Sequence, residues 1–429
     1  MGRCISSGIF NKNYLYILYL IIVSNLKDMV YGYNYNDSFE PIFLGFKDNF
    51  MEFPLMRRIF GYIGTIIMSL IFLYIFASKS KNEILLKKKV DSKINYIYNK
   101  INISKKTLFL FLFLTLIWII EDHLIEIFAS VFKDLDFWML EIIILYYINS
   151  KFFNQEHYLH QKLIIFLNLI LSLFKISVII ISIFGDKEEN ENNSKILYVT
   201  FYKFIPIIIA VYLCLITLRS YVNIKIKWLM DFKFISVSKI LLAYGIIGII
   251  LSSIACMITT IFKCPKNEFF SPICKVKSKN GKIYFDNLIV YYNKFDYFEI
   301  LRIIFGAVLF FFSKYYSLLI IKYFTPIHLI FSIPIYFFFK KIFLIFNTLF
   351  HGNFFIENKM KNIEYKFTLD ISEDFLSFIG FAIYLELIEL NFCGLNYNLG
   401  RHISIRAYSE IYEDSVNYIN DNEEDEIDN

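Results

Sequence analysis

Residues 240–262 read ILLAYGIIGIILSSIACMITTIF, and this stretch decides the fold. It holds 23 residues and no charged side chain. A transmembrane helix needs roughly 20 consecutive apolar residues, because the hydrocarbon core of a bilayer is about 30 Å thick. The stretch therefore predicts a helix that crosses a membrane.

Similar apolar blocks recur along the rest of the chain, separated by short polar loops. The mean hydropathy of +0.51 is too high for a soluble protein of 429 residues. We expect spans at residues 14–24, 59–77, 107–131, 137–149, 163–184, 196–218, 240–262, 300–323, 326–339 and 375–395. The sequence thus predicts an all-α, polytopic (multi-pass) membrane protein with about ten transmembrane helices. For the first block, residues 14–24, the alternative is a signal peptide that is cleaved.

The charged residues argue against several classes of protein. The formal net charge is only +5, and the lysines lie in loops that flank the spans rather than on one basic face, so nucleic-acid binding is not expected. The sequence lacks a P-loop, an H-E-x-x-H helix and a G-x-S-x-G elbow. We therefore expect neither an enzyme nor a cofactor, and no metal site. A membrane-embedded transferase is the most distant alternative.

The lysine distribution predicts the orientation in the membrane. Residues 78–106 contain nine lysines and two acidic residues, and such loops face the cytosol. The acidic stretch 186–193 is expected outside. Both termini then lie in the cytosol, in an endomembrane (ER or Golgi) or in the plasma membrane. The acidic tail at residues 401–429 is predicted to be disordered.

A pair of cysteines lies in the predicted exterior loop at residues 263–299. Cys264 and Cys274 are close enough in sequence to form a disulfide that closes a ten-residue loop. Two free thiols are the alternative.

Two spans share a local pattern. Residues 60–69 read FGYIGTIIMS and residues 244–253 read YGIIGIILSS, each with a G-x-x-G pair followed five residues later by a serine. The glycines are Gly61, Gly64, Gly245 and Gly248, and small residues let helix backbones approach closely. Because each half has five spans, equivalent helices run in opposite directions. This predicts two inverted five-helix repeats, at residues 1–195 and 196–400.

The plan of five plus five spans resembles the drug/metabolite transporter superfamily, which includes EamA-like exporters and nucleotide-sugar carriers. The similarity is most specific at residues 312–341, where SKY at 313–315 leads through FTPIH at 324–328 to SIP at 332–334. Residues 224–248 look like the family's middle linker and seventh span. The F-Y-N-N and G-A-L-N-K elements of GDP-sugar carriers are absent. The resemblance implies a secondary transporter that works by alternating access.

Charged residues inside the spans are the candidate site, because a charge at mid-bilayer costs a few kcal/mol and usually faces a cavity or a partner. One set of similar depth comprises Glu121, Asp122, Glu126 and Lys203. A second comprises Lys314, Glu386 and Glu389, the two glutamates being three residues apart on one helix face. The predicted substrate pathway is Glu126, Lys203, Lys314, His328, Glu386 and Glu389.

In the functional interpretation, a lysine meets an anionic solute and a glutamate takes up a coupled proton. His328, at the end of the ninth span, has a side chain that titrates near neutral pH. In the structural interpretation, Lys and Glu side chains only neutralise one another across helices. We expect a transporter for a small polar or anionic solute, surrounded by lipid bilayer. The alternative is a non-transporting membrane scaffold or partner-binding subunit, and a homodimer is left open.

Overall fold

The structure is a computed structural model that describes residues 14–31, 53–87, 105–131, 138–153, 158–185, 195–262, 264, 276–277, 283–294, 297–351, 372 and 375–385. Its helices are α1 (Tyr14–Tyr31), α2 (Pro54–Lys87), α4 (Lys105–Val131), α5 (Trp138–Phe153), α6 (Leu159–Gly185), α7 (Lys195–Phe232), α8 (Val237–Ile261), α9 (Leu288–Lys294), α10 (Tyr297–Tyr323) and α11 (Pro326–His351). A further short apolar helix covers Phe375–Tyr384. Two strands, β1 (Val276–Lys277) and β2 (Ile283–Tyr284), form an antiparallel hairpin.

The described chain is mostly helical, and four of its helices are long and apolar enough to cross a membrane. These segments are Pro54–Ile75, Lys105–Leu124, Val237–Ile261 and Ile300–Tyr323. Large apolar side chains point outward from them; Ile67, Ile250 and Ile304 are each more than half exposed. Such a surface suits lipid rather than water, so the prediction of a helical membrane protein is confirmed.

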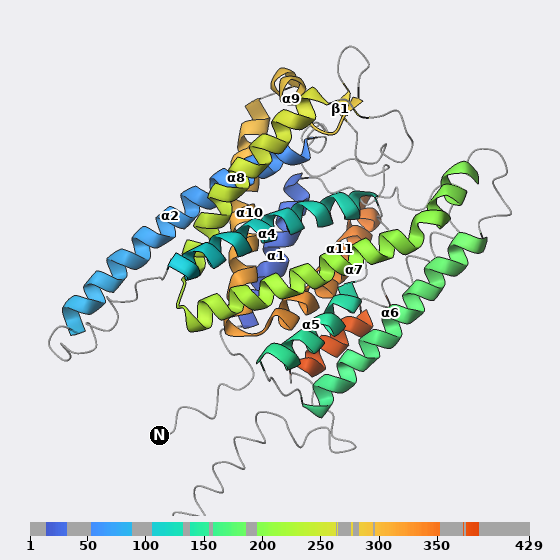
Figure 1. Cartoon of the computed structure of the whole chain (residues 1–429), viewed down its shortest axis with the longest axis horizontal. Coiled ribbons are helices and arrows are strands. Elements are labelled where there is room, and N and C mark those ends of the chain that lie inside the picture. Colours follow the sequence, from blue (N-terminus) through green and yellow to red (C-terminus); the bar gives the residue numbers. More distant parts are fainter. Residues whose placement is uncertain are drawn as a thin grey trace, which may run out of the picture.

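Helices α2, α8 and α10 pack closely together (Figure 1). The start of α2 meets the end of α8, where the Cys256 thiol donates to the Met56 sulfur at 3.6 Å. Farther along α2, Ile66 lies against Gly245 near the start of α8. Helices α2 and α8 are therefore antiparallel.

Glycines allow these close approaches. A Cβ at Gly248 would lie 2.5 Å from the ring of Tyr62 on α2, and a Cβ at Gly64 would lie 2.7 Å from the Cβ of Ala307 on α10. Real Cβ atoms do not tolerate such distances, so any larger residue would push the helices apart. Close helix contact is what small residues supply inside a membrane.

One end of the bundle, which we call the hairpin end, contains β1, β2, α9 and the start of α2 (Figure 1). Asp286 is fully buried there, and its Oδ2 accepts hydrogen bonds from the backbone N–H groups of Leu55 (2.8 Å) and Met56 (3.2 Å). The carboxylate thus caps the first turn of α2 across 231 residues of sequence. Cys264, beside β2, is disulfide-bonded. Its predicted partner Cys274 lies outside the described residues, so that pairing stays a prediction.

The C-terminal end of α10 is capped by a lysine of another helix. The Lys227 ammonium on α7 donates to the backbone carbonyls of Ile321 (3.0 Å), Lys322 (3.3 Å) and Phe324 (2.6 Å). The last carbonyls of a helix have no intrahelical donor and carry partial negative charge, which a cation stabilises. This contact ties α7 to α10.

Candidate functional site

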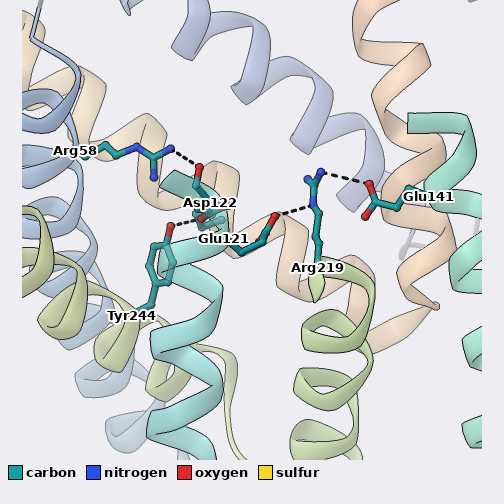
Figure 2. A network of polar contacts seen from close by, with 7 residues as sticks. Arg58, Glu121, Asp122, Glu141, Arg219 and Tyr244 are labelled. Atoms are coloured by element: carbon teal, nitrogen blue, oxygen red, sulfur yellow. Dashed lines mark hydrogen bonds and ion pairs between the residues drawn. The ribbon is translucent and has the colours of Figure 1, made fainter. Parts of the chain in front are cut away.

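Three consecutive polar residues in the second half of α4 form the centre of the candidate site. Glu121, Asp122 and His123 follow one another on a helix with 3.6 residues per turn, so their side chains point in three directions. Each meets a different set of helices. Figure 2 shows Glu121 and Asp122 extending toward different partners. The apolar run of 107–131 makes this segment a helix, and these side chains interrupt that run.

Asp122 binds groups from three other helices. Its Oδ2 accepts a hydrogen bond from the Tyr244 hydroxyl on α8 and forms an ion pair with the Lys314 ammonium on α10, both at 2.5 Å. Its backbone carbonyl accepts a hydrogen bond from Arg58 on α2 at 2.9 Å (Figure 2). One residue of α4 thus joins α2, α8 and α10.

Aromatic rings surround the Lys314 ammonium. Its Nζ lies 5.4 Å from the ring centroid of Trp118 on α4 and 5.4 Å from that of Tyr244 on α8. Both distances fall within the range of cation–π attraction. The two rings contact each other, with centroids 4.4 Å apart. The pair is not sealed, because the side chains of Lys314 and Asp122 keep 22% and 14% of their accessible surface.

His123 extends the polar contacts along the α2–α8 interface. Its Nε2 lies 3.0 Å from the Ser252 hydroxyl oxygen and 3.5 Å from that of Tyr62. Tyr62 is fully buried and packs edge-on against Tyr244, with ring centroids 5.2 Å apart. The histidine therefore contacts a ring that packs against Tyr244, one of the two rings around the Lys314 ammonium.

Glu121 points the other way, toward α7. The Arg219 Nε lies 3.7 Å from its Oε1, and the Nη1 of Arg219 donates to Glu141 Oε2 on α5 at 3.3 Å (Figure 2). Glu121 and Glu141 are both almost completely buried. Arg219 thus holds two carboxylates from different helices.

We call the whole cluster the α4 network. It contains three cations and three carboxylates, namely Arg58, Lys314, Arg219, Glu121, Asp122 and Glu141. Removing one member of a buried ion pair leaves an uncompensated charge, which costs far more than removing both. Removing Lys314 from Asp122 is therefore expected to be costly unless another cation takes its place. Among the described residues, no three His, Cys, Asp or Glu side chains come together in a way that could hold a metal ion.

Of the six residues predicted to line the substrate pathway, the structure describes the side chains of two, Lys314 and His328. Lys314 lies in the α4 network, where its partner is Asp122. His328, near the start of α11, has its Nδ1 2.7 Å from the Thr325 hydroxyl oxygen and stacks on Phe324. Glu126 and Lys203 lie on α4 and α7, but the structure does not describe their side chains. Glu386 and Glu389 lie outside the described residues, so pairing of either with Lys314 stays a prediction.

Sequence reasoning missed several members of the α4 network and several residues that contact it. Glu141 lies inside a predicted span, and an intramembrane carboxylate was the signal that should have selected it. His123 follows two acidic residues that were selected. Arg58 and Arg219 each adjoin the predicted end of a span, where cations also serve orientation. Trp118 and Tyr244 carried no signal, because aromatic residues are common throughout this chain.

No protein-family model matches the chain, and the search of curated proteins found no significant match.

Proposed function

We propose that the chain is a secondary transporter of the drug/metabolite transporter type, which moves a small polar solute across a membrane by alternating access. The observation that carries this proposal is the α4 network. Six charged side chains from five helices meet here, and three of these helices, α2, α4 and α10, are long and apolar enough to cross a membrane. Charged groups inside a membrane often mark a substrate or ion path.

The arrangement of α2 and α8 supports the rest of the proposal, which is ten spans in two inverted five-helix repeats. These are the two helices that share the G-x-x-G pattern, and they pack against each other in opposite directions. Helices related by an inverted repeat run in opposite directions through the bilayer, with the solute site between the halves. The α4 network lies beside this helix pair. Tyr244 of α8 donates to Asp122, and the neighbouring His123 contacts Tyr62 of α2 and Ser252 of α8.

An anionic solute is less well supported than a neutral or cationic one. In this conformation Asp122 already neutralises the Lys314 ammonium. A solute anion would have to displace that carboxylate, which would then remain buried without its cation. The proposal also includes three expectations from the sequence. Transport is coupled to a proton, both termini lie in the cytosol, and the membrane is either an endomembrane (ER or Golgi) or the plasma membrane.

A non-transporting scaffold is the second candidate, and the ion pairs of the α4 network favour it. Each described carboxylate of the network already faces a cation, so the network can hold helices together with no solute. The two candidates differ in whether the network must also respond to a small molecule.

An exchange of charges separates the two functions. The Asp122→Lys/Lys314→Asp double variant keeps an ion pair between α4 and α10. Wild-type protein is first screened in detergent for stabilisation by nucleotide sugars, sugar phosphates, amino acids, nucleosides and amines. The transporter proposal expects a stabilising solute that no longer acts on the folded double variant. A solute that stabilises wild type and double variant equally would contradict a site at Asp122, and a screen with no stabilising solute would favour the scaffold.

Asp231→Asn on α7 is the matched control. Asp231 also pairs with a lysine, Lys227, at 3.5 Å, but outside the α4 network. The solute should stabilise this variant as it does the wild type. Loss of the response in both variants would point to general destabilisation rather than to a solute site.

A further inference from the structure

The surroundings of the Lys314 ammonium have the composition of an ammonium-binding site. One carboxylate oxygen of Asp122 lies 2.5 Å from Nζ, and the rings of Trp118 and Tyr244 are each centred 5.4 Å from it. A carboxylate supplies the opposite charge, and tryptophan and tyrosine rings attract cations through their negative faces. These three groups together select an organic cation over a neutral molecule or an anion.

The site and its occupant come from different helices. Trp118 and Asp122 lie on α4 and Tyr244 lies on α8, whereas Lys314 reaches in from α10. The Tyr244 hydroxyl donates to the same carboxylate oxygen that binds the ammonium, which orients Asp122 without using Lys314. The tight contact between the Trp118 and Tyr244 rings likewise does not involve α10. Contacts that do not involve Lys314 therefore help to set the geometry of the site.

We propose that Asp122, Trp118 and Tyr244 form a binding site for an organic ammonium group, that Lys314 occupies this site as a tethered competitor, and that the transported solute is an amine which takes its place. The last part rests on the proposed function, whereas the binding site does not. Exchange of one ammonium for another keeps Asp122 paired throughout, which avoids the cost of an isolated buried charge. The partial exposure of both side chains gives an incoming amine a way to reach the carboxylate.

The first test is chemical rescue. Lys314→Ala removes three carbons and the nitrogen beyond Cβ, and n-propylammonium supplies the same atoms. The full-length variant is purified in detergent, and its unfolding temperature is measured with n-propylammonium chloride, sodium chloride or n-propanol. We expect n-propylammonium alone to raise it by about 2 °C or more, because a ligand that binds only the folded state stabilises it.

Three matched variants define the specificity. The unfolding temperature of Lys322→Ala, which changes a lysine in the last turn of the same helix, should not respond to n-propylammonium. The Lys314→Ala/Asp122→Asn variant, which lacks the carboxylate, should not respond either. The Lys314→Ala/Trp118→Leu variant should respond, but with an apparent affinity for n-propylammonium at least threefold lower than that of Lys314→Ala. An equal response in Lys314→Ala and Lys322→Ala would overturn the proposal, and so would rescue that survives Asp122→Asn.

A second measurement applies if Lys314→Ala does not fold. In wild-type protein, acetylation of Lys314 is quantified by mass spectrometry relative to Lys225 and Lys322. Tetramethylammonium, which does not consume the reagent, should raise Lys314 acetylation at least twofold over the same concentration of sodium chloride by displacing the ammonium. No increase would overturn the proposal.

The transport part is tested separately in proteoliposomes that contain wild-type protein. Saturable uptake of radiolabelled n-propylammonium together with rescue of Lys314→Ala supports both proposals. Rescue without uptake of n-propylammonium keeps the binding site and overturns the claim that an amine is transported. Uptake of another solute with no rescue and no change in acetylation overturns the ammonium site while the proposed transporter function stands.

Discussion

The buried carboxylate at the hairpin end gives a prediction with a definite sign and size. Asp286 is fully buried, and burial raises its pKa from 3.8 to about 6, although the N–H groups of Leu55 and Met56 and the nearby Arg57 act in the opposite direction. A group whose pKa is higher in the folded than in the unfolded state binds protons more tightly when folded. Its contribution to stability is therefore complete below about pH 4 and is lost as the pH rises through about 6.

The size follows from the shift. A difference of one pKa unit corresponds to about 1.4 kcal/mol, so this shift of roughly two units makes the folded state about 3 kcal/mol less stable at pH 7 than at pH 3.5 through this group alone. Asp286→Asn keeps an oxygen that can accept the two N–H groups but carries no charge. We expect this variant to match wild type near pH 4 and to exceed it by up to about 3 kcal/mol at pH 7.

The assay is thermal unfolding in detergent between pH 4 and pH 8, with wild type and variant measured side by side. Asp231→Asn, which makes the same Asp-to-Asn change at a more exposed carboxylate, is measured beside them as the control. Parallel profiles for wild type and Asp286→Asn would refute the reasoning. So would an Asn variant that is less stable at pH 7, because the charged form would then be the one that the fold favours.

Three further changes should alter the unfolding temperature in known directions. Gly248→Ala should lower the free energy of unfolding by roughly 1–3 kcal/mol, because its Cβ would lie 2.5 Å from a buried aromatic ring. Gly380→Ala, whose Cβ would have its nearest atom at 3.4 Å, should be tolerated. Equal losses of stability in the two variants would contradict this packing. Lys227→Met should cost roughly 1–2 kcal/mol by removing the cap of α10, and Lys225→Met should not, as thermal unfolding would show. Phe234 has a φ of 52° and is exposed, so Phe234→Asn should gain about 1 kcal/mol; a loss of stability would argue against backbone strain there.

The sequence predicted the helical membrane fold for a simple reason. Runs such as residues 240–262 satisfy the length and apolarity that a bilayer demands, and these requirements act on each segment separately. The structure accordingly has a membrane-length apolar helix at Val237–Ile261 and another at Ile300–Tyr323. The ten-span count and the inverted repeat depend on how segments relate to one another, and these stay predictions.

The candidate site was only partly predictable because its contacts are long-range. Lys314 was selected as an intramembrane charge, but depth alone did not show that its partner would be Asp122, 192 residues away. Trp118 and Tyr244 matter because of where they place their rings around an ammonium, and no local pattern encodes that. The cap that Asp286 gives to α2 is equally invisible in sequence, since its acceptor and donors lie in different parts of the chain.

The decisive measurement is uptake into proteoliposomes of the solute that most strongly stabilises the wild-type protein. If the α4 network is a solute site, wild type and Asp231→Asn will take up this solute with saturable kinetics, and Asp122→Asn, folded to the same extent, will not. Equal uptake by wild type and Asp122→Asn, or no uptake by a well-folded wild-type protein, would contradict a solute pathway through Asp122.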